Sequence, residues 1–290
     1  MKKFTSQIFL IAALAAMTVI YALTIDLKEQ DMIVSGLAIV IIGLSLGIER
    51  LAPFSKNWNK SEGDLGGDIT SFVVIFGILD SVLKAMTPFL ILLVMPDFGQ
   101  FNLELPLWAE VIAAGMLIEI AAYISHRLHH KSKYMWQLHA MHHSTKRLYT
   151  LNNFRFHPLN HIINHLFMIA PVIALGFSPQ AILGYTAFTL PILLTQHSNI
   201  DFKFGWLNLV FNTNEVHRWH HSNDESQGNC NLGRALVIWD QVFGTFYLPK
   251  SKTTPDELGL FSSNKNFPAP NALWSQIAYP FSKQCCSEAA

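Results

Sequence analysis

Long apolar runs separated by short polar segments dominate the N-terminal part of the chain. The four longest are Phe4 to Ile25, Met32 to Ile48, Ile69 to Met95 and Leu107 to Ile124. An apolar helix of about 20 residues crosses the hydrocarbon core of a bilayer, so we predict four transmembrane helices. The first run could be read as a secretory signal peptide, but its length and the lack of a small-residue cleavage site favour an uncleaved span.

The later apolar runs depart from a simple spanning helix. The third is longer than one crossing requires, carries Asp80 and Lys84, and continues past Pro88. We expect it to tilt, to kink at the proline or to form a hairpin. Two shorter runs, Ile162 to Phe177 and Ala181 to Gln196, are near the lower length limit for spanning. They predict a helical hairpin that enters the membrane and returns to the same side.

The distribution of lysine and arginine orients these spans. Lysines precede the first span, the loop from Asp26 to Asp31 is mostly acidic, and the next loop carries Arg50, Lys56 and Lys60. Cytoplasmic loops are enriched in these two residues, so four crossings return the chain to the cytoplasmic side. We predict a multi-pass, all-α integral membrane protein.

Three regions follow from this division of the chain. Residues 1–106 hold the N-terminal transmembrane helices, 107–249 form a second domain that contains the fourth span and the hairpin, and 250–290 form a C-terminal tail that we expect to be loose. From His197 onward the sequence is polar and rich in Gly, Asn and Pro, which predicts a cytoplasmic helical cap.

Composition agrees with a membrane protein and excludes other classes. Of the 290 residues 51% are hydrophobic and 14% are charged, whereas soluble domains have about 25% charged residues. The net charge of zero gives no electrostatic basis for a nucleic-acid partner. The cysteines, Cys230, Cys285 and Cys286, are too few and too scattered for a disulfide framework.

Histidine is concentrated in two stretches. Six of the 13 histidines lie between Ser125 and Ser144, and a second cluster occupies His217 to Ser222. The histidines in each stretch are spaced by three or four residues, which places their imidazoles on one face of a helix. A single histidine is usually a hydrogen-bonded or surface residue, but eight with this spacing beside membrane spans indicate a metal site.

The number of histidines predicts two metal ions. One zinc ion takes about four ligands, whereas eight histidines can supply three to five ligands to each of two ions. No HExxH signature of a zinc protease is present. A pair of irons near lipid is the most economical interpretation, because it provides a place to reduce O2 and to attack an unactivated C–H bond.

The motifs around these histidines resemble the fatty acid hydroxylase and sterol desaturase superfamily of membrane di-iron oxygenases. The resemblance rests on HRLHH at 126–130, MWQLHAMHH at 135–143, HRWHH at 217–221, NLG at 231–233 and WDQVFGT at 239–245. It covers about half of the chain, from Leu107 to Leu248. Leu232 replaces the usual aromatic residue, and Glu119 stands where an aspartate is usual.

The resemblance implies a ligand set and no catalytic residue beyond it. The implied metal ligands are His126, His130, His139, His142, His143, His217, His220 and His221, and His197, in TQHSN, matches a further family histidine. His129 falls in the variable position of HRxxH, so we leave it out.

Four further residues are expected to support the ligands. Tyr123 and Glu119 lie one and two turns before His126 on the same helical face, and Glu119 is a candidate to accept its other N–H. Asp240 could do the same or could brace the WDQVFGT turn. His157 precedes Pro158 and would share a helical face with His161 and His165. There we favour a role in supporting a ligand or in polar contact between helices over direct binding of a metal. Whether His157 or His161 is a ligand stays open.

The predicted activity is O2-dependent hydroxylation of a membrane lipid such as a fatty acyl chain or a sterol. The cofactors are two iron ions, O2 is the co-substrate, and an external electron-transfer protein or reductase is the partner, because no haem-attachment, dinucleotide-binding or cysteine-cluster motif is present. Some relatives use a reduced pterin instead. We expect the lipid to enter along a slot between Leu107–Ile124 and Ile162–Gln196.

Three alternatives stay open. Desaturation of a lipid or sterol at the same site is the nearest one. A zinc-dependent membrane hydrolase or lyase is a second, and a metal-binding or transport protein without catalysis is a third. The last predicts polar residues along the spans, which are mostly apolar here.

Overall fold

A computed structural model of the chain describes residues 2–94, 104–264, 266–282 and 285. Four helical segments are long and apolar enough to cross a membrane. They are α1 (Lys2–Thr24), α2 (Gln30–Leu51), a continuous segment made of α3 (Leu65–Ser71), η2 (Phe72–Leu79) and α4 (Asp80–Val94), and α5 (Leu107–Lys131). The four predicted transmembrane helices are therefore confirmed by length and composition, although Met95 lies outside the described residues.

The third span is one helix and not a hairpin. Its middle segment, η2, is a π-helix, and α4 continues through Pro88 to Val94. π-helical segments inside α-helices are rare. Here the segment directs Phe72 and Phe76 toward Phe154, with ring centroids 5.0 and 5.3 Å from it.

The hairpin prediction is confirmed in its secondary structure. It consists of α7 (Pro158–Ala174) and α8 (Pro179–Leu193). Ser178 caps α8 by accepting from the Ala181 amide, while Glu110 of α5 accepts from the Ser178 amide and hydroxyl at 2.5 and 2.9 Å. This cap ties the turn of the hairpin to α5.

Side chains fill the interface between α5 and the hairpin. Ala114 and Ile118 of α5 pack against Val172, Ala181 and Tyr185 in one apolar cluster. At Gly115 an added Cβ would lie 2.2 Å from the Tyr185 ring, so only glycine permits this approach. The prediction of a lipid slot at this interface is therefore wrong over this stretch, because close-packed side chains occupy it.

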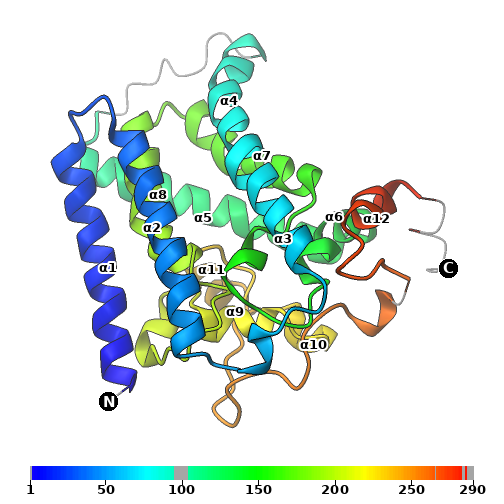
Figure 1. The fold of residues 1–290 in the computed structure, drawn as a ribbon. Helices are drawn as coiled ribbons and strands as arrows, with labels where there is room; N and C mark the ends of the chain where they lie inside the picture. The colour runs from blue at the N-terminus through cyan, green and yellow to red at the C-terminus, as the bar shows by residue number, and fades with distance from the viewer. Residues whose placement is uncertain (1, 95–103, 265, 283–284, 286–290) are drawn as a thin grey trace.

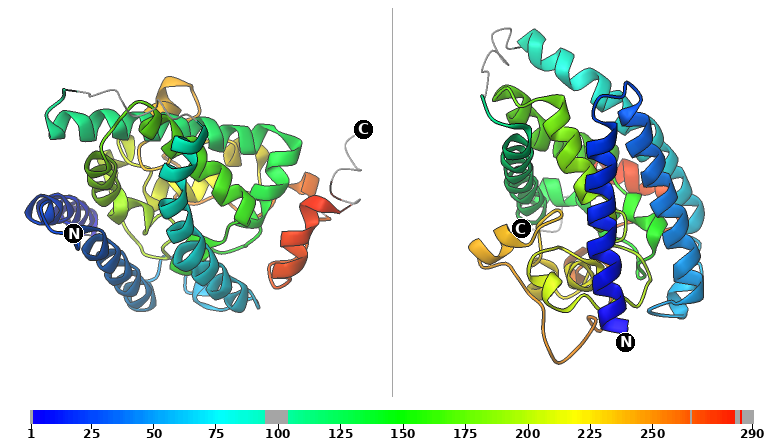
Figure 2. Two further views of the ribbon diagram at one scale, coloured as in Figure 1. Left: turned by 90° about the horizontal axis from the view of Figure 1, so that it is seen from above. Right: turned by 90° about the vertical axis from the view of Figure 1, so that its left-hand side faces the viewer.

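The helices do not form a parallel bundle. α1 packs along α8, where the Tyr21 hydroxyl donates to the Gln180 carbonyl at 2.7 Å. By contrast, α5 lies crosswise to α1. Figure 1 shows α1 upright and α5 running across the molecule, and the right-hand view of Figure 2 looks along α5 while α1 stays upright. This orientation carries the C-terminal end of α5, with its histidines, toward the cap.

The cap is built from short helices joined by irregular chain. Its helices are α6 (Lys133–His143), η3 (Thr150–Phe154), η4 (Gly205–Leu209), α9 (Asn214–His220), α10 (Glu225–Gly228), α11 (Ile238–Val242), η5 (Ser262–Asn264), α12 (Leu273–Ala278) and η6 (Tyr279–Phe281), with η1 (Asn57–Asn59) before α3. The described residues contain isolated β-bridges but no strand. The all-α prediction is confirmed.

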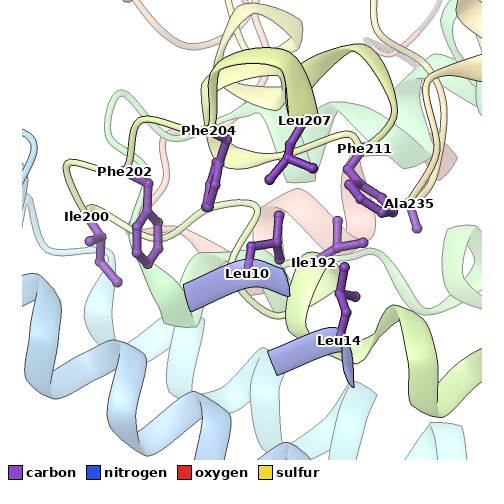
Figure 3. Packing of buried hydrophobic residues seen from close by; sticks show 9 residues of the cluster. All are labelled: Leu10, Leu14, Ile192, Ile200, Phe202, Phe204, Leu207, Phe211 and Ala235. Carbon is purple, nitrogen blue, oxygen red and sulfur yellow. The ribbon is translucent and has the colours of Figure 1, made fainter. Parts of the chain in front are cut away.

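The N-terminal half of α1 belongs to the core of the cap. Leu10 and Leu14 pack against Ile192 and against a row of cap residues that includes Phe202 and Phe204 (Figure 3). Gln7 donates to the Phe204 carbonyl at 2.8 Å. The beginning of the chain and the cap therefore lie at the same end of the molecule.

Buried ionic contacts join the end of α2 and the beginning of α3 to distant parts of the chain. Arg147 donates to both carboxylate oxygens of Asp64 at 2.8 and 2.7 Å, and Arg155 pairs with Asp68. Glu49 at the end of α2 accepts from the amide and hydroxyl of Thr150 at 3.0 and 2.9 Å. These contacts fix the chain between α6 and α7.

Between Leu258 and Tyr279, the described part of the segment after Pro249 is packed, in contrast to the loose tail expected. Phe261, Phe267, Leu273 and Tyr279 are buried in one cluster with Trp136 of α6. The apolar side chains in this segment are irregularly spaced, so no helical or strand period marks them in the sequence. Their burial depends on α6, which is distant in the chain.

Candidate metal centre

Three helices and one turn bring nine histidines to one place. α5 contributes His126 and His130, α6 three residues, α9 and its C-terminal cap three more, and the turn after α8 contributes His197. They form two groups whose nitrogen atoms lie within 4.8 Å of one another. The five-histidine group is His126, His130, His139, His143 and His220, and the four-histidine group is His142, His197, His217 and His221.

The Nε2 atoms converge within each group. In the five-histidine group, the Nε2 atom of His139 lies 3.0 Å from that of His126 and 3.2 Å from that of His143. In the four-histidine group, the Nε2 atom of His217 lies 3.1 Å from those of both His197 and His221. Imidazole rings that meet in this way have the geometry of ligands around a cation.

The hydrogen bonds of the outer ring nitrogens fix the tautomers. The Nδ1 atom of His126 lies 2.8 Å from the Leu232 carbonyl, and that of His220 lies 2.9 Å from the Cys230 carbonyl. A carbonyl oxygen only accepts, so each of these rings carries its proton on Nδ1 and a lone pair on Nε2. Both lone pairs therefore face into the five-histidine group.

Three asparagines make the same contact with other rings. The Oδ1 atoms of Asn229, Asn160 and Asn152 lie 3.1, 3.2 and 2.9 Å from the Nδ1 atoms of His130, His139 and His197. With the amide oxygens assigned in these positions, each histidine again presents an unprotonated Nε2. The donor set of nine imidazoles without a carboxylate fits borderline metals such as iron, copper or zinc.

Burial keeps the imidazoles outside the spans neutral. It lowers the pKa of His142 to about 3 and holds the pKa values of His143, His197 and His217 well below the ordinary 6.5. Nearby histidines lower the last three further. A neutral imidazole is the form that binds a metal, so the rings are in the ligating form at pH 7.

The two groups are in contact. The rings of His143 and His221 stack with centroids 4.3 Å apart, and those of His139 and His142 lie 5.3 Å apart. The four-histidine group is fully buried, whereas His126 and His130 of the five-histidine group are half-buried. Two ions held here would therefore be neighbours, with one nearer the surface.

Comparison with known proteins identifies the family. The fatty acid hydroxylase family model matches residues 111–245. The ornithine lipid hydroxylase OlsE of Rhizobium tropici is 33% identical over 247 residues, which cover 81% of this chain and 72% of that protein. The chain belongs to the fatty acid hydroxylase family.

Two further relatives extend the family beyond bacteria. Human alkylglycerol monooxygenase is 29% identical over 156 residues, which cover 54% of this chain and 35% of that protein. The sphingolipid C4-hydroxylase sur2 of Schizosaccharomyces pombe is 30% identical over 53% of each chain. No solved structure matches the chain.

Glu119 does not contact a histidine, contrary to expectation. Its carboxylate accepts from the Tyr185 hydroxyl at 2.9 Å and from the backbone amides of Ala235 and Leu236 at 3.1 and 3.0 Å, with Arg234 at 3.6 Å. In this chain it binds the segment that follows Leu232. Its effect on His126 is therefore indirect.

Asp240 braces a turn, which was one of the two roles expected of it. Its carboxylate accepts from the amides of Leu232 and Gly233 at 2.7 and 2.8 Å and from the Thr245 hydroxyl at 2.7 Å. Burial raises its pKa to about 6, and these hydrogen bonds oppose that rise. The turn it holds carries the Leu232 carbonyl that meets His126.

Tyr123 and His129 lie beside the site without joining either group. The Tyr123 hydroxyl lies 3.0 Å from the Thr245 hydroxyl, and its ring stacks on Phe243. His129 bonds the Ser125 carbonyl one turn earlier through Nδ1 at 2.8 Å. Leaving His129 out of the ligand set agrees with this position.

The histidines of α7 have separate structural roles. His157 accepts from the Leu159 amide through Nδ1 and bonds the Ile277 carbonyl through Nε2 at 3.0 Å, so it caps α7 and does not bond a histidine of the site. His161 lies 3.5 Å from Asp80, and His165 lies 2.9 Å from the Thr87 hydroxyl. These two pairs join α7 to α4, as a polar seam would.

Sequence reasoning missed the residues that orient and enclose the rings. Asn160 and Asn229 carry no sequence signal, because each reaches its histidine only after distant segments pack together. Phe156 stacks on His142 at 4.3 Å, and Trp136 lies 5.0 Å from His130 and 5.3 Å from His143. For Phe156 and Trp136, the only available signal was a position next to the histidine motifs.

Proposed function

We propose that the chain is an O2-dependent lipid hydroxylase whose two histidine groups each hold one iron ion. The single observation that supports this most strongly is the convergence of imidazole Nε2 atoms in two adjacent groups. The proposed ligands are His126, His130, His139, His142, His143, His197, His217, His220 and His221, in the groups described above.

Iron is favoured over zinc by the chemistry of the relatives. Zinc has no redox activity, whereas the similar proteins are named hydroxylases or a monooxygenase. When bound, the iron pair would supply the reduction of O2 and the oxidation of a C–H bond. One oxygen atom enters the lipid as a hydroxyl group, and the other leaves as water after taking up two electrons and two protons.

The protein's own residues supply order and dryness. The backbone and amide oxygens on Nδ1 hold five of the nine rings in one orientation, which limits the reorganisation needed during turnover. These rings are those of His126, His130, His139, His197 and His220. Burial of the four-histidine group excludes water from that half of the site. Phe156, which is half-buried, stacks on His142 of this group just before α7 begins. We propose that the lipid approaches past Phe156, because the interface of α5 with the hairpin is filled.

The names of the relatives favour hydroxylation over desaturation. They act on ornithine lipid, alkylglycerol and sphingolipid by name, so a membrane lipid with a polar head group is the proposed substrate class. We propose that the site faces the cytoplasm. The lysine-rich beginning of α1 and the cap lie at the same end of the molecule, as the distribution of positive charge predicts.

Labelled oxygen tests this proposal. Cells expressing the intact protein under 18O2 should gain a lipid carrying one 18O atom, and the purified protein should contain two irons per chain. His142→Ala should lose the labelled lipid product and the full iron content. His165→Ala, which changes a buried histidine outside the two groups, should retain the product and the iron content. Iron-loaded intact protein that labels no lipid would contradict the proposal for the lipids present.

A further inference from the structure

An open pocket reaches the five-histidine group at the C-terminal end of α5. Its volume is about 320 Å³, and it lies where α5 ends and α6 begins, between these helices, α10 and the C-terminal segment. His130 lines the pocket directly, together with its partner Asn229.

Trp136 connects the wall of this pocket to the imidazoles. Its indole stacks on Phe261 with centroids 4.7 Å apart and planes 5° apart, and its Nε1 donates to Asn264 at 2.9 Å. The same ring lies beside His130 and His143, at centroid distances of 5.0 and 5.3 Å. A continuous aromatic contact therefore runs from the pocket wall to two proposed ligands.

Among the residues that the structure describes, two lysines and one carboxylate line the pocket. Lys131 and Lys133 line the pocket and are exposed. Glu225 is the opposing carboxylate in the lining, and it accepts a hydrogen bond from Ser263 at 2.8 Å. A cationic rim attracts partners that carry carboxylates, and such attraction increases association rates.

We propose that this pocket is the docking site of an acidic one-electron carrier protein and that electrons reach the five-histidine group through Trp136. This proposal rests on the proposed function, which requires two electrons for each lipid hydroxylated. Two successive carrier molecules each lose one electron. With two protons from water, these electrons reduce one atom of O2 to water while the other enters the C–H bond.

The position of the pocket suits this role. Its lining begins with the last two residues of the fourth span and continues into the residues after it. A water-soluble carrier would therefore reach it at the end of the span, without crossing the bilayer. The five-histidine group is the less buried of the two. Electrons would therefore enter on the side of the site that faces water, and the lipid would meet the buried four-histidine group.

Charge reversal at the rim tests the docking site. Lys131→Glu combined with Lys133→Glu is compared with Lys60→Glu, which reverses an exposed lysine in the loop before α3. The iron-loaded protein is reduced either by a plant-type ferredoxin with its reductase or by methyl viologen radical, a small cation that needs no acidic docking surface. Reduction is followed spectroscopically, and ferredoxin binding is measured by calorimetry at low and high salt.

The expected result is a selective loss. The double variant should lower the ratio of the ferredoxin-driven to the viologen-driven reduction rate by at least about tenfold at low salt, because electrostatic steering contributes about 10- to 1,000-fold to association rates. The deficit should shrink at high salt, and the Lys60 variant should keep the ratio of the intact protein. An unchanged ratio in the double variant would overturn the proposal. So would an intact protein that methyl viologen radical reduces but that ferredoxin neither binds nor reduces.

Trp136→Phe and Trp136→Leu test the electron route. Both should bind ferredoxin with the affinity of the intact protein, but reduction within the complex should be slower in the leucine variant than in the phenylalanine variant. Equal reduction rates in all three proteins would overturn the role of Trp136. If the reduced intact protein hydroxylates no lipid, and hydrogen peroxide also yields no product, the proposed function itself fails, whatever the reduction rates show.

Discussion

The Nε2 atoms of His126 and His139 face each other at 3.0 Å, while each ring's Nδ1 lies against an oxygen acceptor. The acceptors are the Leu232 carbonyl and the Asn160 amide oxygen. With the protons on Nδ1, two lone pairs point at one another across this short distance. A cation between the rings converts that repulsion into two favourable bonds, so metal binding should stabilise the fold.

Metal removal should therefore lower the melting temperature of the protein in detergent. A ligand present at 100 times its dissociation constant stabilises the folded state by about 2.7 kcal/mol. Scanning fluorimetry before and after chelation, and again after adding back Fe2+, measures the change. A variant with both His126→Ala and His139→Ala should respond much less to chelation. An intact protein that melts at the same temperature with and without metal would contradict the prediction.

Asn160→Ala should weaken metal binding without removing a ligand. The amide oxygen of Asn160 orients His139, and loss of such a contact typically costs about 10- to 100-fold in metal affinity. Asn153→Ala is the matched control, because that amide donates to the Leu193 carbonyl at 3.0 Å and meets no histidine. Competition with a chromophoric chelator measures both affinities. Equal affinities in the two variants would show that Asn160 does not orient its histidine.

The histidines were predictable because their spacing is local. His139, His142 and His143 are spaced at i, i+3 and i+4, so the period of the helix alone places them near one another. Their division into groups was not predictable. His142 joins His197, His217 and His221, whereas its neighbour His143 joins the other group. This choice depends on how α6 and α9 cross, which local periodicity does not contain.

The supporting residues failed for the same physical reason. Glu119 was assigned to His126 because the two share a helical face, but the carboxylate bonds the amides of Ala235 and Leu236 instead. The packing of Phe261 and Tyr279 on Trp136 likewise joins segments that are far apart in the chain. Helix type and apolar length could be read from the sequence, whereas contacts between distant irregular segments could not.

Asp64 should make stability depend on pH in the acid range. Burial alone would raise its pKa, but the hydrogen bonds and charge of Arg147 outweigh burial and hold the pKa below its ordinary 3.8. A carboxylate with a lowered pKa stabilises the fold above its unfolded-state pKa, and this contribution is lost as the pH falls through the folded-state value. The melting temperature should therefore fall as the pH drops below about 4.

Asp64→Asn tests this dependence. The variant should be less stable than the intact protein at pH 7 by about 3 kcal/mol, because it leaves the Arg147 guanidinium buried without its counter-ion. It should also lose less stability between pH 5 and the acid limit. Asp256→Asn, which removes an exposed partner of Lys252, should follow the intact protein at every pH. Parallel acid profiles of the Asp64 variant and the intact protein would contradict the prediction.

Glu119→Ala should lower both stability and metal affinity. The carboxylate is fully buried and holds the Ala235 and Leu236 amides, the Tyr185 hydroxyl and, at 3.6 Å, Arg234. Removing one partner of a buried charged contact costs about 3 to 5 kcal/mol. The segment released in this way continues from Leu232, whose carbonyl orients His126, so the five-histidine group should bind its metal more weakly.

Glu110→Ala separates these two effects. Glu110 also bonds a backbone amide from α5, but its partner is Ser178 at the turn of the hairpin, away from both histidine groups. This control should lose stability and keep the metal affinity of the intact protein. If Glu119→Ala likewise loses only stability, Glu119 serves packing alone. A loss of affinity specific to Glu119 would mean that a carboxylate contacting no histidine still controls how His126 meets the metal, because it sets the position of the Leu232 carbonyl.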